Sequence, residues 1–245
     1  MLNRVVLKLS GEALAGEAGH GFDDTVTRNI AGEILSVISD CGTQFSLTVG
    51  GGNFWRGRNT GPAMDRSKSD QIGMLGTVMN AIYLSETFRE LGRRAVVMTP
   101  FPVGTFTEVY RLERALAYLE QGTVVIHAGG LGHPYFSTDT ITALRAAELS
   151  ADGVLYAKNV DGVYDTDPRK NPSARKYRTI SYQKVMADGL DAADVAAMTI
   201  SQQAGTDSYL FALNLPRAIR AACRGDLDGM QGTRIAVAAK EDYYA

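Results

Sequence analysis

Short apolar runs alternate with longer amphipathic stretches along most of this sequence, and this alternation limits the fold more than any other feature. The apolar runs predict strands at residues 5–9, 45–49, 95–98, 124–127 and 154–157. The stretches between them have helical periodicity and predict helices at residues 25–41, 71–92, 111–120 and 138–149. Strands that are apolar throughout are typical of a parallel sheet with helices on both faces. The sequence therefore predicts an α/β fold.

The remainder of the chain is less regular. After Asp161 the sequence is polar and rich in Gly, Asp and Pro until about Ser181. Beyond it we expect strands at 209–213 and 233–237 and helices at 185–187, 195–203 and 218–224. The tail 240–245 has no periodicity and is expected to fray. Because no repeat or long linker divides the chain, we predict a single domain over residues 1–245.

The charge balance points to a small partner. The 245 residues carry a formal charge of −2 and no run of basic residues, which excludes a broad electrostatic surface for nucleic acid. No apolar stretch approaches the roughly 20 residues of a membrane span, and the N-terminus lacks a signal-peptide core. We therefore expect a cytoplasmic protein without nucleic-acid or membrane partners. Cys41 and Cys223 are expected to be buried thiols, and the three histidines lack zinc-site spacing.

Three glycine-rich turns directly follow predicted strands. They are Ser10-Gly11, Gly50-Gly51-Gly52-Asn53 and Gly129-Gly130-Leu131-Gly132. In an open α/β sheet such turns meet at the carboxyl ends of the strands, where ligands bind. Glycine allows backbone N–H groups to approach an anion closely, so three turns together predict a site for several phosphates. The alternative is that glycine only shortens the strand-to-helix connections.

Lys8 lies near the end of the first apolar run, directly before Leu9-Ser10-Gly11. Its ammonium group must reach water or an anion, because burying it unpaired costs too much free energy. The neighbouring turn favours a phosphate, although a strand-end lysine can also simply extend into solvent. The sequence has no G-x-x-x-x-G-K-[ST], and no G-x-G-x-x-G between a strand and a helix. A P-loop kinase and a dinucleotide-dependent dehydrogenase are therefore disfavoured.

Five sequence blocks follow one another along almost the whole chain. They are Lys8-Leu9-Ser10-Gly11-Glu12-Ala13-Leu14, Val49-Gly50-Gly51-Gly52-Asn53 with Arg56-Gly57, Asp70-Gln71-Ile72-Gly73-Met74-Leu75, Pro134-Tyr135-Phe136-Ser137-Thr138-Asp139-Thr140, and Val160-Asp161-Gly162-Val163-Tyr164 with Asp167-Pro168. Together these blocks resemble the bacterial uridylate kinase family of the amino-acid-kinase superfamily.

The resemblance implies a three-layer αβα sandwich with a mostly parallel sheet, which transfers the γ-phosphoryl group of ATP to UMP. It implies an acceptor half at about residues 1–150 and an ATP half at about 151–238. Mg²⁺ would be carried by ATP, with no metal held by the protein alone. The family is usually a homohexamer, with GTP as an activator and UTP as an inhibitor.

The resemblance also implies site residues. The implied catalytic residues are Lys8, Arg56, Asp139 and Asp194. ATP is expected to contact Lys8, Leu9, Ser10, Gly11, Gly52, Arg56, Lys158, Tyr164 and Asp167. UMP is expected to contact Gly51, Asp70, Leu131, Gly132, His133, Pro134, Tyr135, Phe136, Ser137 and Thr138. The segment matching the GTP site is Gly16, Glu17, Ala18, Gly19, His20 and Gly21, although a mobile loop is the alternative there.

Several of these residues have a structural alternative. Asp70 opens a predicted helix, where a carboxylate usually acts as an N-cap, and Asp139 and Asp194 could also be helix caps. Trp55 could stack on a base or pack against the protein. Residues 158–168 could form an ordinary turn, because Asp-Gly and Asp-Pro favour turns. We expect His127, at the end of an apolar strand, to be a hydrogen-bonded core residue.

The chain departs from the family pattern at the acceptor site. Leu131-Gly132-His133-Pro134 stands where the family commonly has Thr-Gly-Asn-Pro, and Ala192-Ala193 precedes Asp194 in place of Val-Met. Phe211-Ala212 replaces the usual Phe-Asn. Two other functions therefore stay open: another phosphotransferase of the superfamily, acting on a carboxylate or carbamate, and a non-catalytic protein that binds nucleotides or oxyanions.

Overall fold

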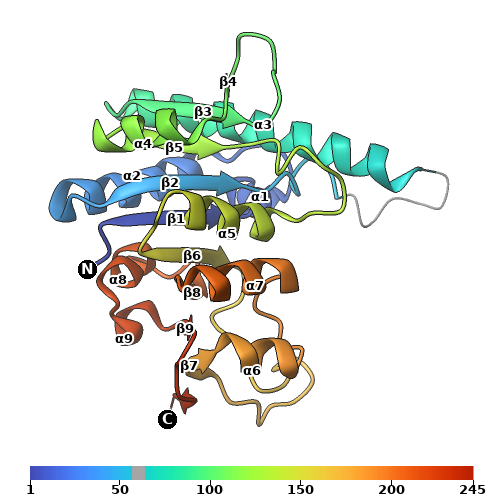
Figure 1. Cartoon of the computed structure of the whole chain (residues 1–245), viewed down its shortest axis with the longest axis vertical. Helices are drawn as coiled ribbons and strands as arrows, with labels where there is room; N and C mark the ends of the chain where they lie inside the picture. The colour runs from blue at the N-terminus through green and yellow to red at the C-terminus, as the bar shows by residue number, and fades with distance from the viewer. Residues whose placement is uncertain (57–63, 245) are drawn as a thin grey trace.

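In the part of the chain that the structure describes, ten strands form one central sheet, shown as a computed structural model in Figure 1. The structure describes residues 1–56 and 64–244, so Gly57 of the second sequence block lies outside the described residues. The strands are β1 (Arg4–Leu9), β2 (Gln44–Val49), β3 (Ala95–Thr99), β4 (Glu108–Val109), β5 (Val124–His127), β6 (Gly153–Lys158), β7 (Tyr177–Ser181), β8 (Asp207–Ala212), β9 (Thr233–Ala236) and β10 (Asp242–Tyr243).

The sheet is mostly parallel. Its order is β10-β7-β9-β8-β6-β1-β2-β5-β3-β4, and only the β10–β7 and β8–β9 pairs are antiparallel. The strands that carry the three glycine turns, β1, β2 and β5, are therefore direct neighbours. The predicted α/β class is confirmed.

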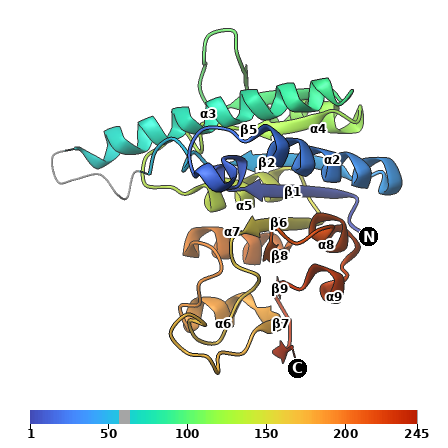
Figure 2. The same ribbon diagram turned by 180° about the vertical axis from the view of Figure 1, so that it is seen from behind.

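Helices cover both faces of the sheet (Figures 1 and 2). Helices α2 (Asp24–Cys41), α3 (Arg66–Glu90) and α8 (Ala218–Arg224) lie on one face, and α4 (Leu112–Glu120), α5 (Thr138–Glu148) and α7 (Val195–Ala204) lie on the other. The shorter helical segments are α1 (Gly11–Leu14), the 3₁₀ turn η1 (Gly16–Ala18), α6 (Tyr182–Ala187) and α9 (Leu227–Met230). The predicted three-layer αβα sandwich is confirmed.

Side chains of β1 alternate between two hydrophobic cores. Val5, Leu7 and Leu9 are buried with α2, α3 and α8, whereas Val6 is buried in the core on the opposite face. The period of two along a strand accordingly directs Lys8 to the same face as Val6, which α5 covers. This alternation decides which helix can meet the lysine.

Three predictions about secondary structure are wrong. Helix α3 begins at Arg66 rather than near residue 71, because Asp65 caps it by accepting a hydrogen bond from the Lys68 N–H at 3.1 Å. Its first residues are polar, so no apolar periodicity marks them. Strand β7 lies within a stretch that we expected to be irregular up to about Ser181. Two residues, Asp242–Tyr243, of the tail expected to fray form β10.

The tail is held by β7. Strand β10 pairs antiparallel with it, and the rings of Tyr177 and Tyr243 lie 4.4 Å apart. An aromatic contact and two residues of pairing leave no periodic signal in a sequence, which explains the error. Cys223 is buried as expected, but Cys41, the last residue of α2, is only half-buried.

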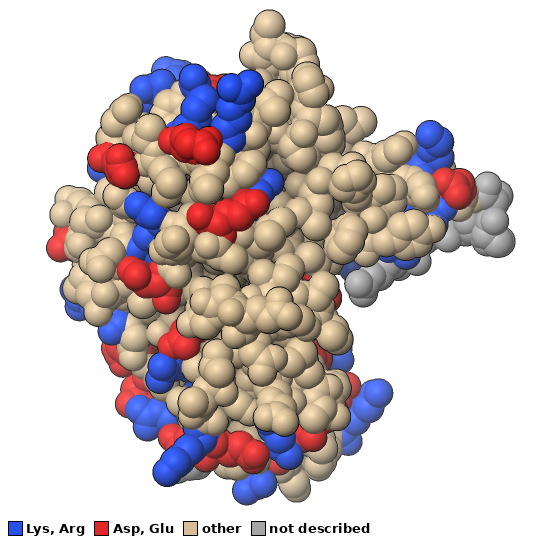
Figure 3. Space-filling view, viewed as in Figure 1, with Lys and Arg blue, Asp and Glu red and all other residues tan. Residues whose placement is uncertain are grey.

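The surface carries mixed charge. On the face shown in Figure 3, basic and acidic side chains form small interspersed groups. No helix in the described part of the chain combines the length and hydrophobicity of a membrane span.

Candidate functional site

A cavity of about 400 Å³ opens at the carboxyl ends of β1, β2 and β5. Because these strands are neighbours, the three glycine turns lie side by side there. The turns contribute Ser10, Gly11, Gly50, Gly51, Gly52 and Gly130 to its wall. The structure thus brings the three turns to one edge of the sheet, as predicted.

Two lysines share one carboxylate beside this cavity. Lys8 Nζ lies 3.3 Å from Asp139 Oδ1, and Lys158 Nζ lies 3.0 Å from Asp139 Oδ2. Lys158 also donates to the backbone carbonyl of Ala192. Strands β1 and β6 are paired in parallel, with Lys8 opposite Tyr156, so Lys158 lies two residues further along the same face. Helix α5 covers this face and supplies Asp139 from its first turn.

The two ammonium groups determine the charge state of Asp139. Burial alone raises the pKa of its carboxyl, but Lys8 and Lys158 outweigh burial, and the pKa lies below its ordinary value. Asp139 is therefore ionised at neutral pH. Because two positive charges face one negative charge, the cluster has a net positive charge, and an anion is attracted to it.

The capping alternative for Asp139 is wrong. Ser137 is the N-cap of α5, and its Oγ accepts hydrogen bonds from the N–H groups of Asp139 and Thr140 at 3.0 and 3.4 Å. The carboxylate of Asp139 is consequently available for the lysines.

Asp194 is the N-cap of α7, as the structural alternative proposed. Its Oδ1 accepts from the Ala197 N–H at 2.8 Å. Its Oδ2 accepts from the hydroxyl of Thr140 at 2.8 Å and from that of Ser137. Asp194 thereby fastens α7 to the start of α5, and a direct role at the phosphates stays a prediction.

Asp70 does not open its helix. It lies in the second turn of α3, and its carboxylate lines the cavity. Arg66 Nε donates to both of its oxygens at 2.8 Å, and the Tyr135 N–H donates to Oδ2 at 2.9 Å. The N-cap alternative is therefore wrong, because Asp65 performs that function.

Glycine is required in two of the turns by close backbone approach. A Cβ on Gly11 would lie 2.6 Å from the carbonyl oxygen of Gly50, and one on Gly51 would overlap the carbonyl oxygen of Gly73. The need for a short strand-to-helix connection is thus part of the reason for glycine at these positions. It does not exclude ligand binding, since the same residues line the cavity.

Sequence analysis missed the side chains of α3 that hold these turns. Asn80 Nδ2 donates to the Gly50 carbonyl at 2.6 Å and to Asn53 Oδ1 at 2.7 Å. Thr77 Oγ1 accepts from the Gly129 N–H at 2.7 Å. Asn80 and Thr77 are buried polar residues of α3. The only signal for them in the sequence was that they are polar and lie in the middle of a predicted helix.

An ion pair lies on another part of the cavity wall. Arg56 pairs with Glu12, with 2.6 Å between Nη2 and Oε1, and both residues line the wall. Trp55 also lines the cavity, and its Nε1 donates to Ser69 Oγ at 2.9 Å. Glu12 belongs to the first sequence block, but we did not predict it as a site residue.

The structure brings most of the predicted acceptor residues to this cavity. Its wall includes Gly51, Asp70, His133, Tyr135, Phe136, Ser137 and Thr138, together with Lys8, Ser10, Gly11, Gly52, Arg56 and Asp139 of the other predicted sets. Leu131, Gly132 and Pro134 belong to the same loop without lining the wall, and Leu9 is buried in the core.

The loop after β6 holds the predicted ATP residues Tyr164 and Asp167 outside this cavity. The hydroxyl of Tyr164 donates to Asp161, and burial together with this hydrogen bond raises the pKa of Tyr164 to about 12. Asp167 accepts hydrogen bonds from the backbone N–H and Nε of Arg169, both at 3.0 Å. Their contacts with ATP stay predictions.

The segment Gly16–Gly21 lies at the surface. It contains the 3₁₀ turn η1, and the Gly21 carbonyl accepts from Asn53 Nδ2 at 2.8 Å. Its role toward GTP stays a prediction. His127 is a buried core residue, as predicted, with its Nε2 2.7 Å from Ser46 Oγ, and burial lowers its pKa well below the ordinary value.

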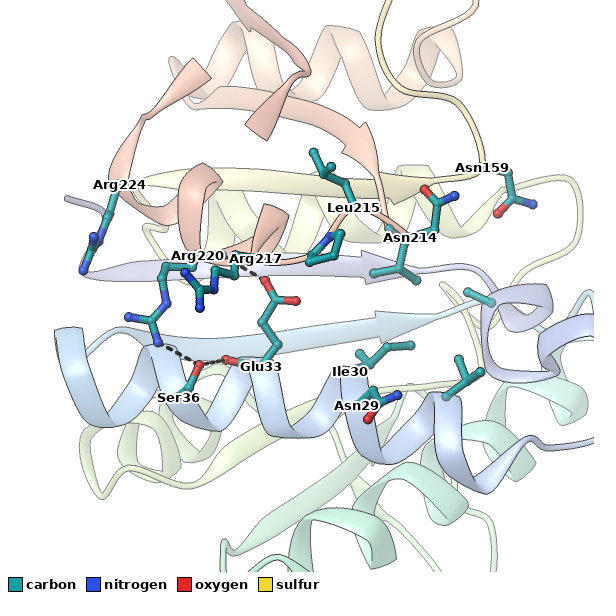
Figure 4. Close-up of a pocket in the computed structure, with 14 residues that line it drawn as sticks. Asn29, Ile30, Glu33, Ser36, Asn159, Asn214, Leu215, Arg217, Arg220 and Arg224 are labelled. Atoms are coloured by element: carbon teal, nitrogen blue, oxygen red, sulfur yellow. Dashed lines mark hydrogen bonds between the residues drawn. The ribbon is translucent and has the colours of Figure 1, made fainter. Parts of the chain in front are cut away.

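A second cavity, of about 910 Å³, lies between α2 and α8 (Figure 4). The side chain of Glu33 on α2 crosses it, and Oε1 accepts from the N–H groups of Ile219 and Arg220 at 2.9 and 3.3 Å. Arg217, the N-cap residue of α8, provides no side-chain cap. Glu33 therefore caps α8 from another helix. Burial raises the pKa of Glu33, although the N–H groups and Arg220 partly oppose this.

Comparison with known proteins extends these observations. The sequence profile of the Amino acid kinase family matches residues 3–212. A uridylate kinase of Streptococcus thermophilus is 46% identical over 228 residues, covering 92% of this chain and 93% of the relative. A uridylate kinase of Deinococcus radiodurans is 41% identical over 237 residues, covering 95% and 97%. The crystal structure of UMP kinase from Bacillus anthracis superimposes with a TM-score of 0.94 at 35% identity, covering 100% and 99%.

Glu33 offers a test of the cap. We expect Glu33→Ala to reduce the free energy of unfolding by about 1 to 2 kcal/mol, because two N–H groups of α8 lose their acceptor. Glu33→Gln keeps an acceptor oxygen and should retain most of the stability. Because the pKa of Glu33 is raised in the folded state, the protonated form favours folding. The stability of the parent relative to Glu33→Gln should therefore fall as the pH rises above about 4.5, the ordinary pKa of a glutamate.

Urea denaturation of the parent, Glu33→Ala and Glu33→Gln at a series of pH values measures the loss of the cap and its dependence on pH. An equal loss of stability in Glu33→Ala and Glu33→Gln would contradict the cap.

Proposed function

The chain belongs to the amino acid kinase family, and on that premise we propose that it transfers the γ-phosphoryl group of ATP to UMP and releases UDP and ADP. The observation that carries this proposal is the sharing of Asp139 by Lys8 and Lys158 next to the glycine turns. The similarity to uridylate kinases extends over nearly the full length of both chains, which supports UMP as the acceptor.

The chemistry needs positioning and charge neutralisation more than covalent catalysis. The transferring phosphoryl group carries negative charge on its equatorial oxygens, with the attacking and leaving oxygens roughly in line. We propose that Lys8 and Lys158 bind these oxygens, while Asp139 orients both ammonium groups. Backbone N–H groups of Gly11 and Gly52 and the guanidinium of Arg56 would bind further phosphate oxygens. No described side chain has to abstract a proton from a hydroxyl, because the acceptor is itself a phosphate.

The two substrates would occupy different halves of the chain. We propose UMP in the cavity of the acceptor half, residues 1–150, with its phosphate near Gly51 and its ribose hydroxyls at Asp70. ATP would extend from Gly11 and Ser10 towards Lys158, Tyr164 and Asp167 in the half formed by residues 151–238. The shared carboxylate of Asp139 lies between these groups, since Lys8 belongs to the first half and Lys158 to the second.

Mg²⁺ enters this proposal with the phosphates of ATP. Within residues 1–56 and 64–244, no three acidic, His or Cys side chains are grouped so as to hold a metal ion. Each oxygen of Asp139 already pairs with a lysine, so this carboxylate is not expected to coordinate a metal ion. When bound, Mg²⁺ would neutralise part of the negative charge of the triphosphate.

We also propose that the protein is a homo-oligomer, by resemblance a hexamer. An apolar stripe on α3 supports self-association, because Ile72, Leu75, Met79 and Ile82 are 39%, 53%, 45% and 38% exposed and share one side of the helix. Activation by GTP at Gly16–Gly21 and inhibition by UTP remain part of the proposal, and a change in rate when each is added to the assay below would test them.

An ADP-release assay with a panel of acceptors tests the proposed reaction. With ATP and Mg²⁺, UMP should give the highest kcat/KM among UMP, CMP, AMP, GMP, carbamate and glutamate. Release with a carboxylate or carbamate alone would identify another phosphotransferase of the superfamily. Nucleotide binding without ADP release for any acceptor would identify a non-catalytic binding protein.

Lys8→Ala tests the charge at the transferring group. We expect kcat to fall by roughly a hundredfold or more, because a preorganised cation is lost where charge develops. Thermal unfolding should change little. Lys184→Ala removes a half-buried lysine of α6 that pairs with Asp188, the C-cap of that helix, and it serves as the control. A folded Lys8→Ala protein with nearly normal turnover would contradict the assignment.

Leu75→Asp tests the apolar stripe. A charge there should oppose association, so light scattering should give a smaller mass for this variant than for the parent. Gln121→Asp at the exposed end of α4 should leave the mass unchanged. A parent protein with the mass of a single chain, 26.4 kDa, would exclude the oligomer.

A further inference from the structure

Arg66, Asp70 and Tyr135 form a cluster on the wall of the acceptor cavity. Arg66 and Asp70 are one turn apart on α3, and Arg66 Nε donates to both oxygens of Asp70 at 2.8 Å. The backbone N–H of Tyr135, in the loop between β5 and α5, donates to Asp70 Oδ2 at 2.9 Å. One carboxylate therefore joins the helix to the loop.

Arg66 contacts the loop as well as the carboxylate. Its guanidinium carbon lies 5.5 Å from the ring centroid of Tyr135, which is within the range of a cation–π interaction. Tyr135 has a φ of 73°, a left-handed conformation that a residue with a side chain adopts only at a cost in free energy. The hydrogen bond from its N–H to Asp70 helps to retain this conformation. Tyr135 is 69% exposed at the rim of the cavity.

We propose that Arg66 is a positioning residue for the acceptor nucleotide, an inference that rests on the proposed function. Arg66 fixes the carboxylate of Asp70 and, together with it, the backbone and ring of Tyr135. Asp70 can accept about four hydrogen bonds. Arg66 Nε, which contacts both oxygens, and the Tyr135 N–H occupy three of these positions, so one position on Oδ1 stays open for a ribose hydroxyl. Arg66 thus acts on the acceptor through two neighbours.

The position of the cluster separates this role from one in stability. An exposed ion pair between residues one turn apart contributes little to folding. Misplacing a carboxylate that must meet a ribose hydroxyl weakens binding strongly, because the contact depends on geometry. Loss of Arg66 should therefore change acceptor binding and hardly change the free energy of unfolding.

The test compares Arg66→Ala and Arg66→Lys with the parent. For Arg66→Ala we expect the KM and Kd for UMP to rise roughly tenfold, the cost typical of losing a hydrogen bond to a charged group. The KM for ATP and kcat should stay within about twofold. Arg66→Lys keeps the charge without the planar guanidinium and should give an intermediate KM for UMP.

The chain offers a control away from the cavity. Arg28 on α2 pairs with Asp24 through Nε at 2.8 Å, also one turn apart, and its side chain is 40% exposed against 42% for Arg66. Arg28 additionally pairs with Glu90. Arg28→Ala should leave the KM for both nucleotides unchanged. The pair Arg66→Ala and Asp70→Asn provides a double-mutant cycle. The combined effect on the KM for UMP should be clearly smaller than the product of the single effects, because both changes disrupt one unit.

The outcomes distinguish the two proposals. A parent protein that does not transfer phosphate to UMP overturns the proposed function. A parent that uses UMP while Arg66→Ala retains its KM for UMP overturns the positioning role alone. Equal rises in the KM for UMP and ATP, or independent effects of Arg66→Ala and Asp70→Asn, also overturn it.

Discussion

The sharing of Asp139 by Lys8 and Lys158 is the interaction on which the rest of the site depends. Two ammonium groups near the end of a buried sheet need a counter-charge, because desolvated cations are costly when unpaired. The pairing of β1 with β6 brings the lysines together, and α5 supplies the carboxylate from the face to which both point. Since the charges do not cancel, the carboxyl ends of these strands attract anions.

This arrangement requires a rigid frame, which α3 provides. Its buried Asn80 and Thr77 are hydrogen-bonded to Gly50 and Gly129, and so the second and third glycine turns are held by the same helix. Phosphoryl transfer depends on keeping two nucleotides in line, so small displacements of these turns would matter. The same helix also carries Asp70 and Arg66 on the cavity wall. Helix α3 is therefore a support for the site as well as a part of it.

The departures from the family pattern differ in importance once the cavity is known. His133 lines the cavity wall, whereas Leu131 belongs to the same loop without lining it. The histidine is thus the replacement that can contact a ligand in this cavity. Ala192 is part of another departure, and its backbone carbonyl accepts a hydrogen bond from the Lys158 ammonium, a contact that does not require a particular side chain. The loss of larger side chains before Asp194 is therefore compatible with the lysine pair.

The sequence by itself determined the α/β class, the main strands and helices and the three glycine turns, because periodicity and turn chemistry are local properties. Its sequence blocks also predicted Lys8, Asp70 and Asp139 as site residues, and the structure brings all three to one cavity. Only the tertiary structure decided which role each carboxylate takes: Ser137 caps α5 and frees Asp139, while Asp65 caps α3 and leaves Asp70 to Arg66 and Tyr135. The formation of β7 likewise depends on its pairing with β9 and β10, and the formation of β10 depends on its pairing with β7. These outcomes depend on contacts between residues far apart in the chain, for which a local pattern carries no signal.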